Sequence, residues 1–318
     1  MSEKYSAFMP SIAKTRIAPD PLAILGWSAF FSQQTDAETL SQTAPVRVTS
    51  VHRSGLQVQG KDVQTLLPPR QDATVGDWLL YDAERPQEST LLERKSLIKR
   101  RSPGKDRFEQ LIAANIDTAF IVTSCNADYN IARLERYVAL AFDADVTPVI
   151  LLTKPDLCED TAPFVDQARS LSDLLEIVLI NAKSPEAAEL LAPWCKSGQT
   201  VAFLGSSGVG KSTLSNALAG SDAIETGDVR EGDSKGRHTT TRRQLHFVPS
   251  GCAVLDTPGM RELQLTDAAA GVGDVFADLQ TLATQCKFRD CAHDSEPGCA
   301  VKAALAAGDI DAPRVERW

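Results

Sequence analysis

The chain of 318 residues lacks any apolar run that approaches the roughly 18 residues needed to span a membrane. Its start, MSEKYSAFMP, is not followed by the apolar stretch of a secretory signal. Internal repeats and low-complexity tracts are also missing. Because 43% of the residues are apolar and 24% are charged, the chain is able to bury a core and is not disordered overall. We therefore expect a soluble, cytoplasmic protein of two or three domains that has no membrane partner.

An excess of positive charge is also absent, because 33 Lys and Arg stand against 42 Asp and Glu and give a net charge of −9. This balance argues against uniform, sequence-blind binding to nucleic acid. Residues 44–108 differ, because they hold 12 Lys and Arg against 8 Asp and Glu. Such a basic module would suit docking of one face on a polyanion, although a solvated loop with chance lysines has the same composition.

The N-terminal half of the chain divides at about residue 44. Residues 1–43 are polar, and we expect a mostly flexible or locally helical extension there. Residues 44–101 contain short apolar runs separated by Gly and Pro, which predict a small β-barrel of the oligonucleotide-binding (OB) kind or an SH3-like one. The basic segment 94–105 ends in Pro103-Gly104, and we interpret it as a linker.

Residues 102–265 alternate between apolar strands and helices, which predicts a mostly parallel sheet covered by helices. After Gly259 the strands stop, and residues 266–318 contain a Cys/His-rich segment and one Ala-rich helix. The predicted fold class is therefore α/β with a barrel before it and a helical metal-binding module after it. The expected strands are 118–124, 146–152, 177–180, 200–204 and 252–255, and the expected helices are 131–142, 211–219 and 300–307.

Residues 205–212, GSSGVGKS, fit the phosphate-loop pattern G-x-x-x-x-G-K-[ST] at every fixed position. The segment follows a predicted strand and opens a predicted helix, so its N–H groups and the helix N-terminus would face phosphate oxygens. Lys211 would reach the β- and γ-phosphates, and Ser212 would offer a hydroxyl to Mg²⁺. An ordinary Gly/Ser-rich turn is the alternative. The predicted phosphate-binding residues are Gly205, Ser206, Ser207, Gly208, Val209, Gly210, Lys211, Ser212 and Thr213.

A second phosphate-related motif, Asp256-Thr257-Pro258-Gly259, follows the last predicted strand. Asp256 is placed to hold Mg²⁺ directly or through water, and the N–H of Gly259 would sense the γ-phosphate. On its own the motif is an ordinary turn. Its position downstream of a phosphate loop favours the functional interpretation.

Two further motifs predict which base is bound. Thr153-Lys154-Pro155-Asp156 follows a predicted strand, and the carboxylate of Asp156 would accept hydrogen bonds from N1–H and the exocyclic amine of guanine. Adenine has no proton at N1, so a carboxylate there would discriminate against it. Lys154 would lay its methylene stem along the base. Asn181-Ala182-Lys183 follows the next strand and would offer a backbone N–H to the guanine O6.

Cys286, Cys291, His293 and Cys299 have the spacing C-x4-C-x-H-x5-C. Three thiolates and one imidazole suit tetrahedral Zn²⁺, and four protein ligands predict one structural ion. Unpaired thiols or a disulfide are the alternatives, which a reducing compartment disfavours. We expect the other four cysteines to be small apolar core residues.

The motifs T-K-P-D, N-A-K, G-K-S-T, H-T-T-T and D-T-P-G resemble the five nucleotide motifs of Ras-like GTPases, but the base-reading pair precedes the phosphate loop. With a barrel before and the stretch CKFRDCAHDSEPGCAV after them, the chain from residue 46 to 318 resembles the circularly permuted ribosome small subunit-dependent GTPase A (RsgA) family. The resemblance implies a GTP hydrolase that acts late in 30S maturation, binds 16S rRNA and is stimulated by the small subunit. The usual Asn of the base motif is Thr153 here.

The resemblance also points to the loop 236–241 for catalysis, because Met260 stands where many GTPases have a water-orienting Gln. His238 is the expected water-positioning residue, and Thr240 is the expected additional Mg²⁺ ligand. A lone His is otherwise more often a surface or packing residue. We expect slow intrinsic turnover that rises when a partner orders this loop.

The expected ligands are GTP and GDP, and the expected state is a monomer. RNA backbone contacts are expected from Arg47, Arg53, Lys61, Lys99, Arg100 and Arg101. Two other functions stay open. One is a P-loop ATPase or kinase in which T-K-P-D is a chance turn. The other is a zinc-bearing nucleic-acid-binding module with a vestigial nucleotide site.

Overall fold

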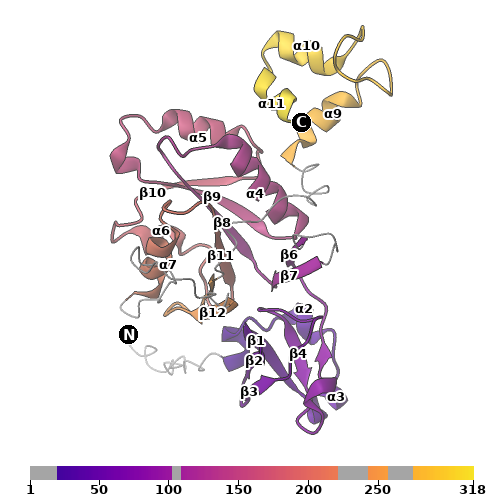
Figure 1. Ribbon diagram of the computed structural model, residues 1–318, viewed down its shortest axis with the longest axis vertical. Coiled ribbons are helices and arrows are strands. Elements are labelled where there is room, and N and C mark those ends of the chain that lie inside the picture. Colours follow the sequence, from indigo (N-terminus) through magenta and orange to yellow (C-terminus); the bar gives the residue numbers. More distant parts are fainter. Residues whose placement is uncertain (1–19, 102–108, 221–242, 257–274) are drawn as a thin grey trace, which may run out of the picture.

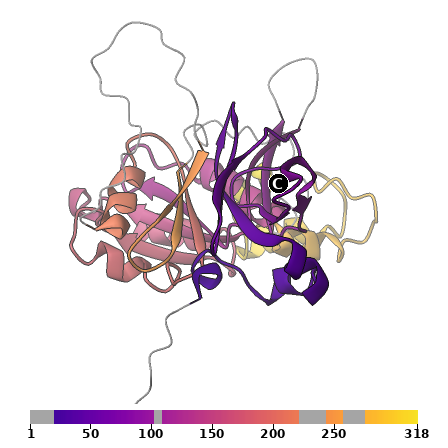
Figure 2. The ribbon, with the colours of Figure 1, turned by 90° about the horizontal axis from the view of Figure 1, so that it is seen from below.

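The computed structural model describes residues 20–101, 109–220, 243–256 and 275–318. A β-rich N-terminal part, a central α/β part and a C-terminal helical part follow one another along the long axis of the molecule (Figure 1). Seen from below, the N-terminal strands stand beside the central sheet, and the C-terminal helices lie behind the N-terminal strands (Figure 2).

The central sheet is mostly parallel, as predicted. Its strands run in the order β10, β9, β8, β11 and β13, with β12 antiparallel to β13. Parallel pairing requires long crossovers, which the intervening helices supply. The bounds are β8 Thr118–Ser124, β9 Thr147–Thr153, β10 Glu176–Ile180, β11 Thr200–Leu204, β12 Arg243–Phe247 and β13 Ala253–Asp256.

Helices cover both faces of this sheet. In β8, Ala119 and Ile121 pack in the cluster with helix α4, whereas Phe120 and Val122 pack in the other cluster. This alternation follows from the two-residue period of a strand and buries both faces. The covering helices are α4 Ile131–Asp143 and α5 Ala162–Arg169 on one face, and α6 Ala187–Leu191 and α7 Lys211–Ala219 on the other.

Five short strands form the N-terminal β-part around a buried cluster that includes Val46, Val48, Leu56 and Val58. Strand β1 pairs with β2 and β4, β2 pairs with β3, and β4 pairs with β5. Among the described strands no pair joins β3 to β5, so closure into an OB barrel stays a prediction. The bounds are β1 Ala44–His52, β2 Gly55–Gly60, β3 Gln64–Leu67, β4 Trp78–Tyr81 and β5 Thr90–Leu91, with a 3-10 turn, η1, at Pro86–Glu88.

The two sheets are continuous. The end of β1 pairs antiparallel with the start of β12, where Ser50 lies opposite Gln244 and Val51 opposite Arg243. Arg243 also donates from Nη1 to the carbonyl oxygen of Leu111 at 2.7 Å. The N-terminal strands therefore extend the central sheet through main-chain hydrogen bonds.

The prediction of a linker at 94–105 is wrong over the described part of that segment. Strand β6 (Leu97–Arg101) pairs antiparallel with β7 (Glu109–Ala114). The basic composition suggested a solvated linker, but Ile98 is buried in the core next to α4 and fixes the strand. Lys99 forms an ion pair of 3.0 Å with Glu109 across the hairpin, so its charge is compatible with the pairing.

Residues 20–43 are helical, in agreement with the locally helical alternative, but they are not a free extension. Phe31 is buried, and its ring centroid lies 5.7 Å from that of Trp78. Trp27 packs edge-on against the same Trp78 at 4.9 Å. The helices are α1 Pro21–Ile24, α2 Ala29–Ser32 and α3 Ala37–Gln42.

The C-terminal part consists of α9 Ala277–Ala283, α10 Ala300–Ala307 and α11 Ala312–Arg317. Val275, Phe276 and Leu279 join the core cluster of the central sheet and α4, so this part is anchored by apolar packing. Within the described ranges, no helix combines the length and the apolar character needed to cross a membrane.

Candidate functional site

The predicted nucleotide motifs meet at the carboxyl edge of the parallel sheet. The base motif starts at Thr153, the last residue of β9, and 181–183 follow β10. The phosphate loop begins at Gly205 after β11, and Asp256 ends β13. Because these strands are parallel, the segments that follow them emerge at one edge, which is where open α/β sheets bind ligands.

The phosphate loop has the backbone that its glycines permit. Gly205, Gly208 and Gly210 have φ values of 135°, 76° and 105°, a region in which other residues are strained. A Cβ on Gly205 would lie 2.2 Å from the carbonyl oxygen of Val122. The loop therefore packs tightly on β8 and leads into α7, for which Gly210 is the N-cap residue.

The Lys211 side chain curls back over the loop that precedes it. Its Nζ donates to the carbonyl oxygen of Gly205 at 2.9 Å and also to that of Ser206. The ammonium group is therefore held at the helix N-terminus, beside the backbone of the phosphate loop. A cation and a helix N-terminus in one place form an anion-binding arrangement.

The base-motif turn packs directly against the phosphate loop. A Cβ on Gly210 would lie 3.5 Å from Cβ of Ala182 and 3.8 Å from Cγ2 of Thr153. Lys154 adopts the left-handed conformation with φ 58° and precedes the short turn η2 (Pro155–Leu157). This places Asp156 on an exposed turn at the same edge of the sheet.

The loop after β10 is held by its own Asn. The Asn181 side-chain Oδ1 accepts from the N–H of Lys183 at 3.0 Å, and its carbonyl oxygen accepts from Ser184 at 2.9 Å. Together with the contact of Ala182 at Gly210, this turn lies beside both the phosphate loop and the base motif. The structure thus brings 153–156, 181–183 and 205–213 together.

Several predicted residues lie outside the part that the structure describes. His238, Thr240 and Gly259 belong to the segments 221–242 and 257–274. Asp256 is placed by its backbone, which pairs opposite Gln244 of β12. The assignments of these residues to catalysis and Mg²⁺ remain predictions.

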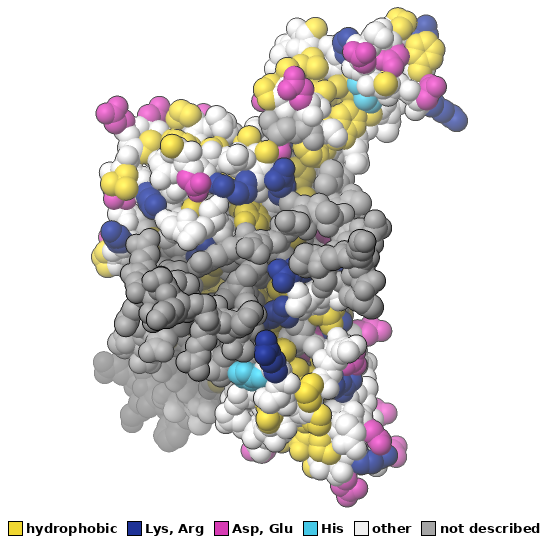
Figure 3. All heavy atoms as spheres, in the orientation of Figure 1, with side chains coloured by type: hydrophobic (Ala, Val, Ile, Leu, Met, Phe, Trp, Pro, Cys, Tyr) yellow, Lys and Arg dark blue, Asp and Glu magenta, His cyan; other side chains and the backbone are white. Residues whose placement is uncertain are grey.

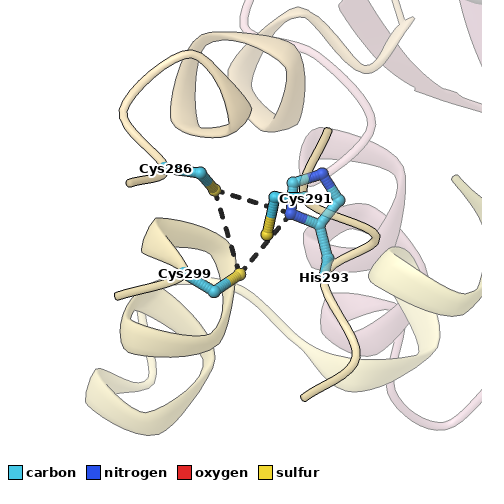
Figure 4. Close-up of side chains that lie close together, drawn as sticks. All are labelled: Cys286, Cys291, His293 and Cys299. Atoms are coloured by element: carbon cyan, nitrogen blue, oxygen red, sulfur yellow. Dashed lines mark hydrogen bonds between the residues drawn. The ribbon is translucent and has the colours of Figure 1, made fainter. Parts of the chain in front are cut away.

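The four predicted metal ligands converge. One ligand atom each from Cys286, Cys291, His293 and Cys299 lies within 4.8 Å of the others. Nδ1 of His293 is 3.6 Å from Sγ of Cys286 and 3.5 Å from Sγ of Cys299 (Figure 4). Cys299 is the N-cap residue of α10, so the helix start brings its sulfur to the cluster. Soft thiolates with one imidazole are the donor set that tetrahedral Zn²⁺ prefers.

Backbone N–H groups support the sulfur atoms. Ala300 donates to Sγ of Cys286 at 3.3 Å, and Lys302 donates to Sγ of Cys299 at 3.4 Å. Burial raises the pKa of the Cys286 thiol, but the N–H groups of Ala300 and Val301 and the neighbouring thiols hold it below its ordinary value overall. Burial raises the pKa of Cys291 to about 11, with the neighbouring thiols adding to the increase.

Two residues beside the metal cluster were missed by sequence reasoning. The Glu296 carboxylate accepts from Ala292, Asp294 and Ser295 at 2.9 to 3.1 Å, and so orders the loop that carries His293. The Trp318 ring packs against the His293 ring at 5.1 Å. A carboxylate one to four residues from N–H groups is a turn signal, whereas nothing local in the sequence pairs Trp318 with His293.

Arg47 is a correction, because it was expected to contact RNA but is only 2% exposed. Its guanidinium donates to the carbonyl oxygens of Leu25 at 2.6 Å and Asn115 at 3.2 Å, and to Oγ1 of Thr200 at 2.8 Å. Burial lowers its pKa to about 10. The sequence shows the charge of Arg47 but not the cluster of acceptors that distant segments build around it.

The other basic candidates differ in their exposure. Arg53, Lys61 and Lys99 are exposed and Arg100 is half-buried, whereas the Arg101 side chain lies outside the description. On the face drawn in Figure 3, Lys and Arg side chains occur across the middle of the molecule, and Asp and Glu gather toward the far end of the barrel. Positive charge is thus available near the junction of barrel and central sheet.

Comparisons with known proteins agree with this arrangement. The family model described as RsgA GTPase matches residues 91–266. The small ribosomal subunit biogenesis GTPase RsgA of Mesorhizobium japonicum is 51% identical, with 98% of this chain and 91% of that protein covered. The protein named RsgA 2 from Vibrio vulnificus is 47% identical, with 96% and 88% covered.

Two solved structures have a similar fold. The crystal structure of YjeQ from Thermotoga maritima matches with a TM-score of 0.64 at 27% identity, covering 86% of this chain and 95% of that one. The structure of YloQ, described as a circularly permuted GTPase, matches with a TM-score of 0.58 at 26% identity, covering 86% and 92%.

Proposed function

Because the chain belongs to the RsgA family of GTPases, we propose that it hydrolyses GTP during maturation of the small ribosomal subunit. The observation that carries this proposal is the packing of three loops at one sheet edge. Gly210 of the phosphate loop lies next to both Thr153 and Ala182, which belong to the two segments predicted to bind the base. Such a site would bind one nucleotide by its phosphates and its base together.

We assign each loop the role that its sequence motif predicts. Residues 205–213 would bind the phosphates, 153–156 and 181–183 would bind guanine, and Gly259 would contact the γ-phosphate. Asp156 is the residue that would select guanine, because its carboxylate needs two donors that adenine does not present. A P-loop ATPase or kinase is less well supported, because it gives no role to the packing of 153 and 182 on the phosphate loop.

Hydrolysis would need Mg²⁺ with the nucleotide. Ser212, Thr240 and Asp256 are the proposed ligands, and Mg²⁺ would neutralise charge on the phosphate oxygens. Ser212 lies in the first turn of α7, directly after Lys211, which fits this role. His238 is the residue proposed to orient the attacking water.

The C-terminal module would be held by one structural Zn²⁺. All four donors come from the chain and lie within 4.8 Å of one another, so no outside ligand is needed. We assign residues 266–318 to this module, 102–265 to the GTPase domain and 44–101 to the barrel, with 1–43 preceding it.

The partner would be the 30S subunit, through 16S rRNA. Both named relatives are small ribosomal subunit biogenesis GTPases, and the exposed Arg53, Lys61 and Lys99 offer phosphate contacts. We propose that the protein works as a monomer in the cytoplasm, where ribosomal subunits are assembled.

The test is GTPase turnover with and without purified 30S subunits, with ATP as the competing nucleotide. We expect stimulation by 30S subunits and no inhibition of binding by excess ATP. Asp156→Asn should weaken GDP binding by about 100-fold, because the guanine N1–H loses a charged acceptor. Xanthosine diphosphate should bind this variant better than GDP does, since its 2-oxo group accepts from the new amide.

Two results would contradict the proposal. Equal competition by ATP and GTP would show that Asp156 does not select the base. Binding of GTP without any turnover, with or without 30S subunits, would favour the zinc-bearing nucleic-acid-binding module with a vestigial nucleotide site.

A further inference from the structure

Thr153 joins two parts of the nucleotide site through one side chain. Its Oγ1 lies 2.6 Å from the carbonyl oxygen of Val209 in the phosphate loop. The carbonyl oxygen of Thr123 in β8 lies 3.1 Å from the same atom. Thr153 itself is completely buried, so these contacts are shielded from water.

The backbone of Thr153 is fixed independently of this contact. Thr153 pairs opposite Ser124 of β8 and Ile180 of β10, and its carbonyl oxygen accepts from Cys125 at 2.9 Å. Its Oγ1 therefore projects from a central strand whose position the sheet determines. The phosphate loop receives its hydrogen bond from a rigid element.

The chemistry of a hydroxyl limits what else Thr153 is able to do. A Thr hydroxyl carries one proton, and both of its near neighbours here are carbonyl oxygens, which only accept. The shorter distance assigns the proton to Val209. No donor then remains on this side chain for a purine ring nitrogen such as N7, which is an acceptor.

We propose that Thr153 is a positioning residue, which ties the phosphate loop to the base-motif turn and does not read the base. This inference rests on the proposed function. Guanine would then be selected by Asp156, which would contact the Watson–Crick edge of the base. Thr153 would set the affinity for every nucleotide that uses the phosphate loop.

The experiment measures dissociation constants of the full chain for GDP and 7-deaza-GDP, which replaces the N7 acceptor with a C–H group. Thr153→Val keeps the shape of the side chain and leaves the Val209 carbonyl without its donor. We expect GDP binding to weaken by about 10-fold. Thr153→Ser keeps the hydroxyl and should restore binding to within about threefold of the original protein.

The ratio of the two dissociation constants separates positioning from readout. We expect the same ratio in the original protein, the Val variant and the Ser variant. A preference for GDP over 7-deaza-GDP that disappears in Thr153→Val would show that the hydroxyl reaches N7 and would overturn the proposal. Unchanged GDP binding in Thr153→Val, with the thermal midpoint retained, would also overturn it.

Failure of the proposed function gives a different result. In that case the original protein would not prefer GDP to ADP, whatever residue stands at 153. A preference for GDP that survives, together with no effect of Thr153→Val, would remove only the inference about Thr153.

Discussion

Arg47 shows at the scale of one residue how a charge is used for assembly. Its guanidinium joins the N-terminal helices at Leu25, the N-terminal β-part at Gly76, the β7–β8 connection at Asn115 and the central sheet at Thr200. A buried charge is costly unless its donors are satisfied, and here each contact is to an acceptor. Arg47 thus links three parts of the fold at the opposite end of β11 from the phosphate loop.

Replacing this residue should lower stability without changing the nucleotide site. Arg47→Met leaves several buried acceptors without donors, and we expect the free energy of unfolding to fall by about 3 kcal/mol. Urea denaturation measures this change. GDP affinity, measured where the variant is still folded, should stay the same because Thr200 lies at the far end of β11.

Arg53→Met is the matched control, because Arg53 is an exposed arginine in the turn between β1 and β2. A surface change of this type should alter the free energy of unfolding by no more than about 0.5 kcal/mol. If Arg47→Met unfolds at the same urea concentration as the original protein, the association of these three parts of the fold does not depend on the Arg47 guanidinium.

At the scale of elements, helix α11 connects the metal cluster to the central sheet. Arg314 donates from Nη2 to the carbonyl oxygens of Leu171 at 3.2 Å and Val275 at 3.0 Å, and forms an ion pair with Asp278 at 2.9 Å. At the other end of the helix, Trp318 packs on the metal-cluster residue His293. One short helix therefore touches both the α5–β10 connection and the Cys/His cluster.

Arg314→Met should loosen the C-terminal part from the central sheet. The substitution removes the polar contact to Leu171. We therefore expect the free energy of opening of residues 275–318 to fall by about 2 kcal/mol. Amide hydrogen exchange measures this opening, and β8 and β11 should keep their protection. Glu316→Gln, an exposed change in the same helix, is the control. Equal exchange in both variants would show that apolar packing at Phe276 and Leu279 alone holds the part in place.

Elements governed by local patterns were predictable from the sequence. The strand Thr118–Ser124 and the helices Lys211–Ala219 and Ala300–Ala307 have the expected bounds, because periodicity, glycines and an N-cap act over a few residues. The pairing of β1 with β12 was not predictable, since its partners are distant in the chain and edge strands carry no local mark of their neighbour. The hairpin of β6 and β7 was not predicted, because its basic composition indicated a solvated linker and Ile98 gave no sign in the sequence of being buried.

The candidate site was predictable in its residue types but not in its internal contacts. The phosphate loop and the Cys/His spacing are fixed by chemistry that a sequence records directly. The sequence shows that Thr153 replaces the usual Asn of the base motif, but it does not show what the Thr153 side chain contacts. The hydroxyl reaches Val209 because the strand positions Thr153 beside the loop, and only the three-dimensional register reveals this.

In the whole molecule, the metal cluster and the nucleotide site are held by different structural elements. The cluster lies in the loop from Cys286 to Cys299, beyond α9, whereas the nucleotide motifs follow strands of the central sheet. Among the described residues, the C-terminal part contacts the central part through Val275, Phe276 and Leu279 and through Arg314, none of which belongs to the nucleotide motifs. Loss of metal should therefore unfold the loop and leave the phosphate loop intact.

Removal of zinc with a chelator tests this separation. We expect the fluorescence of Trp318 to change, because its contact with His293 is lost, while GDP affinity changes by less than about twofold. Trp318→Phe is the control that identifies the signal against the other three of the chain's four tryptophans. A parallel loss of GDP affinity would mean that the apolar contact at Phe276 transmits disorder into the sheet. The C-terminal part would then belong to the folding unit of the nucleotide site rather than to an independent module.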